Sequence, residues 1–298
     1  MGIMLFCNIF NIGNKKPSWV KIKMMKKLTV FLLLLVHVGI VAQRKPKIKG
    51  NRTVVEVKEE LSAFNAIELK DDLEIELVRA PMEGYKVVAD DNLLDVLKFK
   101  VEDSTLYISS FYKIQSKKKL EITVYYTDLV QLVQQDGKMV SKESIATDIL
   151  DIQVLGSARM EVNASAALVR VQMDEKSSGD FNFAADSLHV NMKDRADARI
   201  YTVGESSYIE LSSNASASME GTVDVVQVEA VDNADFKAER YEAKVIKAKL
   251  ENSTSAYLRA LEELELTTSG SSKTYIYGNP KITILEFLDT SELIKRKD

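Results

Sequence analysis

A four-residue phrase returns about every twenty residues through the second half of the chain, and it constrains the fold more than any other feature. Each copy has a polar turn-forming residue, a small residue in nearly every case, any residue and a large apolar anchor. The anchors are Met139, Met160, Phe181, Ile200, Met219, Phe236, Tyr257 and Tyr275. Their spacing stays nearly constant from the first copy to the last. A period of this size, held over eight copies, is typical of a solenoid.

The segments between anchors predict the content of each coil. Stretches such as 169–173 and 188–192 alternate apolar and polar residues, the pattern of a strand with one buried face. We therefore expect two or three short strands per coil, joined by turns that the polar phrase residues close. Stacking predicts one inner column of Met173, Met192, Leu211 and Val228, and another of Met160, Phe181, Ile200, Met219 and Phe236.

The predicted fold class is all-β, a right-handed β-helix-like solenoid with coils of about 20 residues and a less regular N-terminal β portion. A series of antiparallel hairpins is the alternative, because the absence of proline between Pro81 and Pro280 suits either layout. The near-constant period favours parallel stacking.

The start of the chain predicts export. A basic patch at Met25-Lys26-Lys27 precedes an apolar run over 28–41 and the small residue Ala42. This order is that of a secretory signal peptide, and the run is short for a membrane-spanning helix of ~20 residues. We expect translation to start at Met24 or Met25 and cleavage near Gln43, with a retained N-terminal anchor as the alternative.

Loss of residues 1–42 changes the charge of the chain. Six lysines and no acidic residues would leave, so that the net charge falls from −4 to −10. Such an acidic body argues against nucleic acid as a partner. The only cysteine, Cys7, would leave as well, which excludes disulfides in the mature chain.

The first half of the mature chain has longer strand-like stretches and no fixed repeat. It is either a small sandwich-like unit or a set of irregular coils that cap the solenoid. The predicted division is a leader and signal peptide over 1–42, with 1–24 upstream of the start, and a flexible segment over 43–52. An N-terminal β portion then covers 53–127, the solenoid 128–282 and a C-terminal tail 283–298.

Several phrases together resemble a known family. They are Phe64-x-x-Ile67-x-Leu69, Ala89-Asp90-Asp91-Asn92-Leu93-Leu94-Asp95, Leu106-Tyr107-Ile108 and Tyr275-Ile276-Tyr277-Gly278-Asn279-Pro280. With the repeats, they resemble the putative auto-transporter adhesin, head GIN domain family, a secreted domain of unknown function, over residues 62–282. The resemblance implies adhesion or surface display in a Gram-negative bacterium, in the periplasm, at the outer membrane or outside the cell. Turns in that family are richer in Gly and Ser than the Asn-containing turns here, and Asn also tolerates left-handed conformations.

The chain has few residues of the kinds that catalytic and metal sites need. Only His37 and His189 are present, and His37 belongs to the leader, so a zinc site or a Ser-His-Asp triad would lack its parts. The acids Asp180, Asp197 and Asp235 are the only metal candidates. Turn and ladder roles explain them better, with Asp180 expected between Arg159 and Arg199 in a ladder of alternating charge. We expect no catalytic residue, no metal and no cofactor.

The sequence therefore predicts an exported, non-catalytic binding or adhesin-like module. Its expected partner is an envelope or surface protein or a glycan, with no nucleic acid and no stable membrane span after signal cleavage. A carbohydrate-active enzyme on a β-helix and a structural envelope protein are the alternatives.

Overall fold

The computed structural model describes residues 45–297, and every strand lies in the compact unit Pro46–Asp298. The predicted start codon, signal peptide and cleavage site lie outside the described residues and stay predictions. Within residues 45–297 there is no helix with the length and apolar character needed to cross a membrane.

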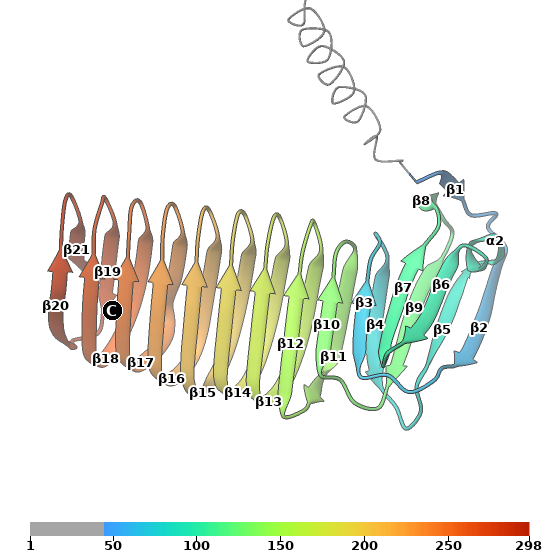
Figure 1. Ribbon diagram of the computed structural model, residues 1–298, viewed down its shortest axis with the longest axis horizontal. Helices are drawn as coiled ribbons and strands as arrows, with labels where there is room; N and C mark the ends of the chain where they lie inside the picture. Colours follow the sequence, from blue (N-terminus) through green and yellow to red (C-terminus); the bar gives the residue numbers. More distant parts are fainter. Residues whose placement is uncertain (1–44, 298) are drawn as a thin grey trace, which may run out of the picture. The chain divides into compact units, whose positions relative to one another are not determined.

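Six long strands of 14–16 residues form the body of the molecule (Figure 1). They are β13 (Arg159–Met173), β14 (Ser178–Met192), β15 (Asp197–Leu211), β16 (Ser216–Ala230), β17 (Asp235–Leu250) and β18 (Ser255–Thr268). Each strand pairs in parallel with the next, one coil takes about 19 residues, and the stack makes about nine turns. The predicted β-solenoid is confirmed.

Each long strand contributes to two sheets. The first half of β13 pairs with β11 (Lys138–Ala146), and its second half pairs with β12 (Ile149–Val154). We call the sheet formed by the first halves the first sheet and the other the second sheet. Side chains of both sheets belong to one continuous core, as Met160 of the first and Met173 of the second illustrate. The separate short strands expected from the sequence are therefore the two halves of one continuous strand.

The predicted inner column of the first sheet is two neighbouring columns. Phe181, Ile200 and Met219 are in register with one another. Met160 and Phe236 lie in the adjacent column. Met160 pairs with the residue two positions before Phe181, and Phe236 pairs with the residue two positions before Met219. A shift of two residues returns a side chain to the same face of a strand, so all five side chains are buried.

The last two anchors, Tyr257 and Tyr275, face outward, unlike the anchors of the predicted inner column. Their rings stack on the outer face of the first sheet with centroids 4.5 Å apart, while Ala256 and Leu258 are buried. The residue of β18 in register with the anchor Phe236 is Ala256, so Tyr257 stands one position too late to continue the column. A difference of one residue turns a side chain to the opposite face.

The predicted inner column of the second sheet is right for three of its four members. Met173, Met192 and Leu211 are in register and buried. Val228 pairs with Ile209, two residues before Leu211, and so lies in the adjacent inner column.

Tight turns join the second half of each strand to the next coil. The second residue of each turn has a positive φ, a conformation that Gly, Asn and Asp adopt most readily. These residues are Gly156, Glu175, Asp194, Ser213, Asp232, Asn252, Gly270 and Asp289. The turns bond to one another across coils, as the backbone N–H of Arg195 does to the carbonyl of Glu175 at 2.8 Å.

The chain doubles back at the N-terminal end of the stack. The coil of β3 (Ala66–Leu69) and β4 (Glu74–Arg79) lies between two others (Figure 1). On one side it pairs with β10 (Gln131–Gln134) and β11, and on the other with β7 (Thr105–Ser110) and β9 (Leu120–Tyr126). Both sheets thus continue across the predicted boundary at 127, and the irregular-coil alternative describes this region.

Antiparallel strands close that end. In the first sheet β9 pairs with β5 (Gly84–Asp90), which pairs with β2 (Val54–Glu60); in the second sheet β7 pairs with β6 (Leu97–Glu102). The short helix α2 (Asp91–Leu94) links β5 to β6 and buries Leu93 completely. Tyr85 and Phe99 stack between the two sheets with ring centroids 3.9 Å apart. We call β2, β5, α2 and β6 the cap.

A buried carboxylate of β5 joins the cap to the segments that precede β2 and β9. Asp90 has no exposed surface, and its oxygens accept backbone N–H bonds from Arg52, Lys118 and Lys119, each at 3.1 Å. Burial would raise the pKa of Asp90, but these three donors hold the pKa below its ordinary value.

The segments around the cap are more ordered than the sequence predicts. Within 43–52, expected to be flexible, β1 (Lys47–Lys49) pairs in parallel with β8 (Lys113–Ser116) in a separate two-stranded sheet.

The predicted C-terminal tail also holds strands. After β19 (Lys273–Tyr277), β20 (Lys281–Phe287) extends the second sheet and β21 (Glu292–Lys295) the first. These strands form the last coil of the stack, and every residue of β20 is exposed.

Candidate functional site

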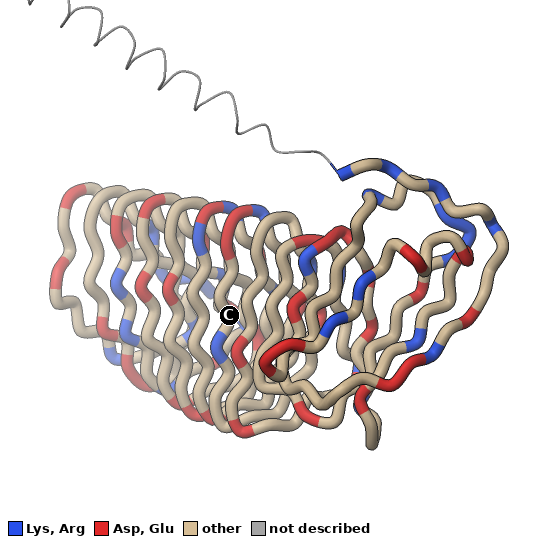
Figure 2. Tube along the Cα trace, turned by 45° about the vertical axis from the view of Figure 1, so that its right-hand side comes forward, with Lys and Arg blue, Asp and Glu red and all other residues tan. Residues whose placement is uncertain are grey.

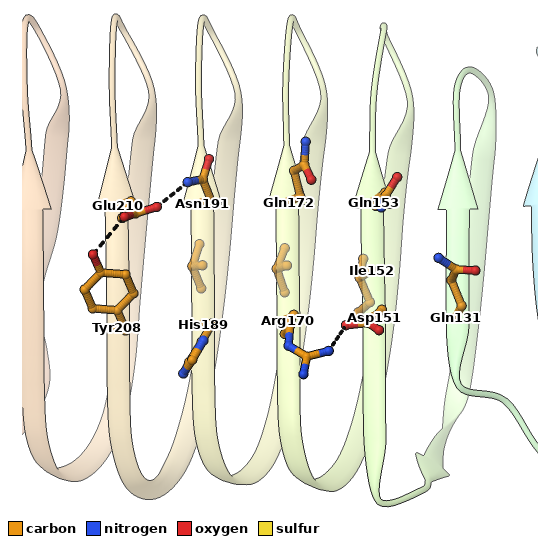
Figure 3. A pocket seen from close by; sticks show the side chains of 12 residues that line it. Gln131, Asp151, Ile152, Gln153, Arg170, Gln172, His189, Asn191, Tyr208 and Glu210 are labelled. Atoms are coloured by element: carbon orange, nitrogen blue, oxygen red, sulfur yellow. Dashed lines mark hydrogen bonds and ion pairs between the residues drawn. The ribbon is translucent and has the colours of Figure 1, made fainter.

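A shallow groove of about 390 Å³ crosses the outer face of the second sheet over β10 and β12 to β15 (Figure 3). Two rows of outward side chains line it. The first row is Gln131, Asp151, Arg170, His189 and Tyr208, and the second is Gln153, Gln172, Asn191 and Glu210. The buried residues Ile152, Val171 and Val190 lie between the rows. The groove is therefore a polar strip with a floor of sheet backbone.

The constant register builds both rows. Asp151, Arg170, His189 and Tyr208 follow one another at intervals of about 19 residues, the length of one coil. Because alternate residues of a strand face outward, each member lies beside the next at the ~4.8 Å spacing of neighbouring strands.

Neighbouring side chains in the rows bind one another. Arg170 Nη1 donates to Asp151 Oδ1 at 2.8 Å across one coil step. Glu210 accepts from the Tyr208 hydroxyl at 2.8 Å and from the amide of Asn191 (Figure 3). These contacts hold the carboxylates in fixed positions along the groove.

An aromatic pair occupies the end of the groove away from Gln131. The rings of His189 and Tyr208 meet edge to face with centroids 5.9 Å apart. The hydrogen bond to Glu210, with partial burial and the charge of that carboxylate, raises the pKa of Tyr208 to about 12. The phenol is therefore neutral near pH 7 and donates to Glu210.

This arrangement suits binding better than acid-base catalysis. It offers amide, guanidinium and hydroxyl groups together with an aromatic pair along an extended track. The two carboxylates of the groove, Asp151 and Glu210, lie three strands apart, which is ~14 Å at ~4.8 Å per strand. Glycosidases hold their paired carboxylates ~5–9.5 Å apart.

The metal candidates predicted from the sequence do not come together. Asp180 binds Arg199, Asp235 binds Lys237 at 2.9 Å, and Asp197 stands between two serine positions at the start of β15. Among residues 45–297, no group of three or more His, Cys, Asp or Glu side chains could hold a metal ion.

The predicted charge ladder is half right. Asp180 pairs across strands with Arg199 on one side, as predicted, but with Glu161 on the other. Arg159 stands two residues earlier in register and binds Glu161 at 3.2 Å. Figure 2 shows acidic and basic positions distributed along the neighbouring coils.

Reasoning that takes His189 and Tyr208 one at a time misses the groove. His189 is exposed, and Tyr208 of the next coil lies beside it. The recurrence of Asp151, Arg170, His189 and Tyr208 once per coil was the signal that could have found it. Among the other tyrosines, Tyr126 and Tyr241 are core residues, whereas Tyr201 is 49% exposed.

A comparison with protein-family models matches residues 63–183 and 176–280 to the family described as putative auto-transporter adhesin, head GIN domain. The chain belongs to the head GIN domain family. The resemblance inferred from its phrases is confirmed. A comparison with curated proteins finds no match.

Solved structures share the head GIN fold. A putative adhesin from Parabacteroides distasonis ATCC 8503 is 14% identical with a TM-score of 0.66, over 84% of this chain and 100% of that one. A putative adhesin from Parabacteroides merdae ATCC 43184 is 14% identical with a TM-score of 0.60, over 84% and 99%. A putative lipid binding protein from Parabacteroides distasonis ATCC 8503 is 18% identical with a TM-score of 0.56, over 85% and 98%. At these identities the likeness shows the fold.

Proposed function

We propose that this protein is an exported, non-catalytic adhesin-like module that binds a glycan chain through the groove of the second sheet, at the cell envelope or surface. The observation that carries the proposal is the pair of in-register polar rows. They offer hydrogen-bonding groups at every coil step along a straight track. A polyhydroxylated chain with regularly repeating units fits such a track, because every coil step presents polar side chains to it.

The lining of the groove favours a sugar over an acyl chain. Its outward side chains are polar or charged throughout, and its apolar members are buried beneath them. One structural relative is described as a putative lipid binding protein. An acyl chain in this groove would leave Arg170, Asp151 and Glu210 facing hydrocarbon, which is costly.

Export and a surface or envelope location rest on the leader predicted from the sequence and on the family description. The absence of catalysis rests on the separation of Asp151 from Glu210 and on the ion pairs that occupy Asp180 and Asp235.

Glycan-array screening followed by titration calorimetry tests the proposal. Tyr208→Ala should weaken glycan binding about tenfold, which corresponds to ~1.4 kcal/mol. Tyr201→Ala is the matched control, since Tyr201 is an exposed tyrosine in the other half of β15. It should leave the affinity unchanged.

Two results would contradict the proposal. One is an equal loss of affinity in both variants. The other is turnover of a polysaccharide that disappears in Asp180→Ala or Asp235→Ala, which would favour the enzyme alternative.

A further inference from the structure

The C-terminal end of the solenoid leaves its core open. In β20 the side chains of Ile282, Ile284 and Phe287 continue the inner columns of the second sheet. Nothing stacks on them within residues 45–297, and their exposed fractions are 41%, 46% and 42%. Leu285, an extra residue at a bulge in the pairing with β18, is 57% exposed. Apolar side chains this exposed, beside a free strand edge, indicate an interaction surface.

We propose that this edge pairs with β20 of a second copy of the chain, so that two solenoids join end to end through their C-terminal coils about a two-fold axis. With the axis perpendicular to the sheets, the two β20 strands run antiparallel. Both sheets then continue from one copy into the other.

The sequence of β20 is self-complementary in this arrangement. Lys281, Thr283 and Glu286 face outward, because they pair with outward positions of β18. With Thr283 opposite Thr283 of the second copy, and Leu285 outside the register at the bulge, Lys281 comes opposite Glu286 of the second copy. The two-fold axis makes this ion pair twice. Cross-strand pairs of opposite charge stabilise antiparallel strands.

The same register matches the apolar side chains. Ile282 lies opposite Ile284 of the second copy, and the axis repeats this pair as well. Each open core would then be covered by the other, which continues the columns through the interface. A closed two-fold interface uses the same patch on both copies, as a self-complementary strand requires.

The opposite end of the molecule does not offer such a surface. There α2, Leu93 and the Tyr85–Phe99 stack close the core between the sheets. A second copy therefore matches the open end and not the capped one, and the expected product is a closed dimer rather than a filament.

Sedimentation equilibrium tests the proposal. The protein is purified from the cells that produce it, without further truncation. The unchanged protein should form dimers at concentrations of about 100 µM or below. Lys281→Glu and Glu286→Lys each place like charges opposite one another twice and should weaken dimerisation at least about tenfold. The double variant with the two charges exchanged should recover the unchanged dissociation constant to within about threefold.

Lys98→Glu is the matched control, because Lys98 is an exposed lysine on β6, the edge strand of the capped end. It should not alter the dimer. Circular dichroism of each variant should match that of the unchanged protein, so that a loss of dimer is separated from a loss of fold. Ile284→Lys, which places a charge in the apolar contact, should also give monomers.

A protein that stays monomeric at these concentrations would overturn the proposal. A double variant as weak as either single one, a dimer that Lys98→Glu dissociates, or open-ended oligomers would also overturn it.

Discussion

The two ends of this solenoid differ in how the last inner columns of the core are covered. At the N-terminal end, antiparallel strands and a short helix cover the last inner columns, and Leu93 and Ile108 are completely buried. At the C-terminal end the last coil repeats the body, so Ile284 occupies an inner position and is still 46% exposed. A repeat buries its core only against a neighbour. The cap is therefore made of segments that do not follow the repeat, whereas the open end is an ordinary coil with no further coil of the described residues stacked on it.

The largest expected effect comes from truncating one isoleucine to alanine at each end. Ile108→Ala should lower the free energy of unfolding by about 2–4 kcal/mol, because it leaves a cavity in a closed core. Ile284→Ala in the monomer should cost less than about 1 kcal/mol, since much of that side chain is already in water. Chemical denaturation followed by circular dichroism measures both values. Similar losses in the two variants would remove the distinction between the ends.

A smaller effect on stability should come from replacing Asp90, the buried carboxylate of β5. In Asp90→Asn one oxygen that accepts backbone N–H bonds becomes an NH₂ group, so the cap should be less stable at pH 7. The pKa of Asp90 is lowered in the folded chain, so its contribution is present above its unfolded value of about 4 and is lost as the pH falls.

The difference between Asp90→Asn and the unchanged protein should therefore narrow below pH ~4 in denaturation at a series of pH values. Asp95→Asn, an exposed acid just after α2, is the control and should behave like the unchanged protein. A difference that stays constant from pH 7 to pH 3 would show that Asp90 acts through shape alone.

The smallest effect should come from the hydroxyl of Tyr85. Burial first, and then the hydrogen bond and charge of Glu59, raise the pKa of Tyr85 to about 12. Its neutral form therefore stabilises the cap below pH ~10, and this contribution is lost as the pH rises toward 12. Tyr85→Phe keeps the ring on Phe99 and should cost only about 0.5–1 kcal/mol at pH 7.

The variant should also lose less stability than the unchanged protein between pH 10 and 11.5 in alkaline denaturation. Tyr112→Phe, in an exposed loop, serves as the control and should leave the alkaline loss unchanged. Equal alkaline losses with Tyr85 and with Phe at this position would contradict the assigned role.

The solenoid was predictable because large apolar side chains recur in the sequence at nearly constant spacing. Phe181, Ile200 and Met219 are in register, as their equal spacing predicts. The prediction failed at the step from Phe236 to Tyr257, which lie 21 residues apart, because β17 and β18 pair there with an offset of 20 residues and a difference of one residue turns a side chain to the opposite face. Tyr257 therefore faces outward although its spacing is close to that of the true anchors.

The cap and the groove were harder to predict for different reasons. The pairing of β1 with β8 and the N–H bonds of Asp90 join segments far apart in the sequence, and neither follows a period. The groove does follow the period. Its members, such as Arg170 and His189, differ in chemistry, so a search for like residues at regular spacing passes over them.

The position of the β3–β4 coil inside the stack has a consequence for assembly. In sequence this is the first of the parallel coils; the β7–β9 coil follows on one flank, and β10, β11 and the later strands follow on the other. The stack therefore extends in two directions from this coil. A further coil inserted in the arm that begins with β10 and β11 would meet a parallel neighbour on each side, whereas the antiparallel strands of the cap close the other arm.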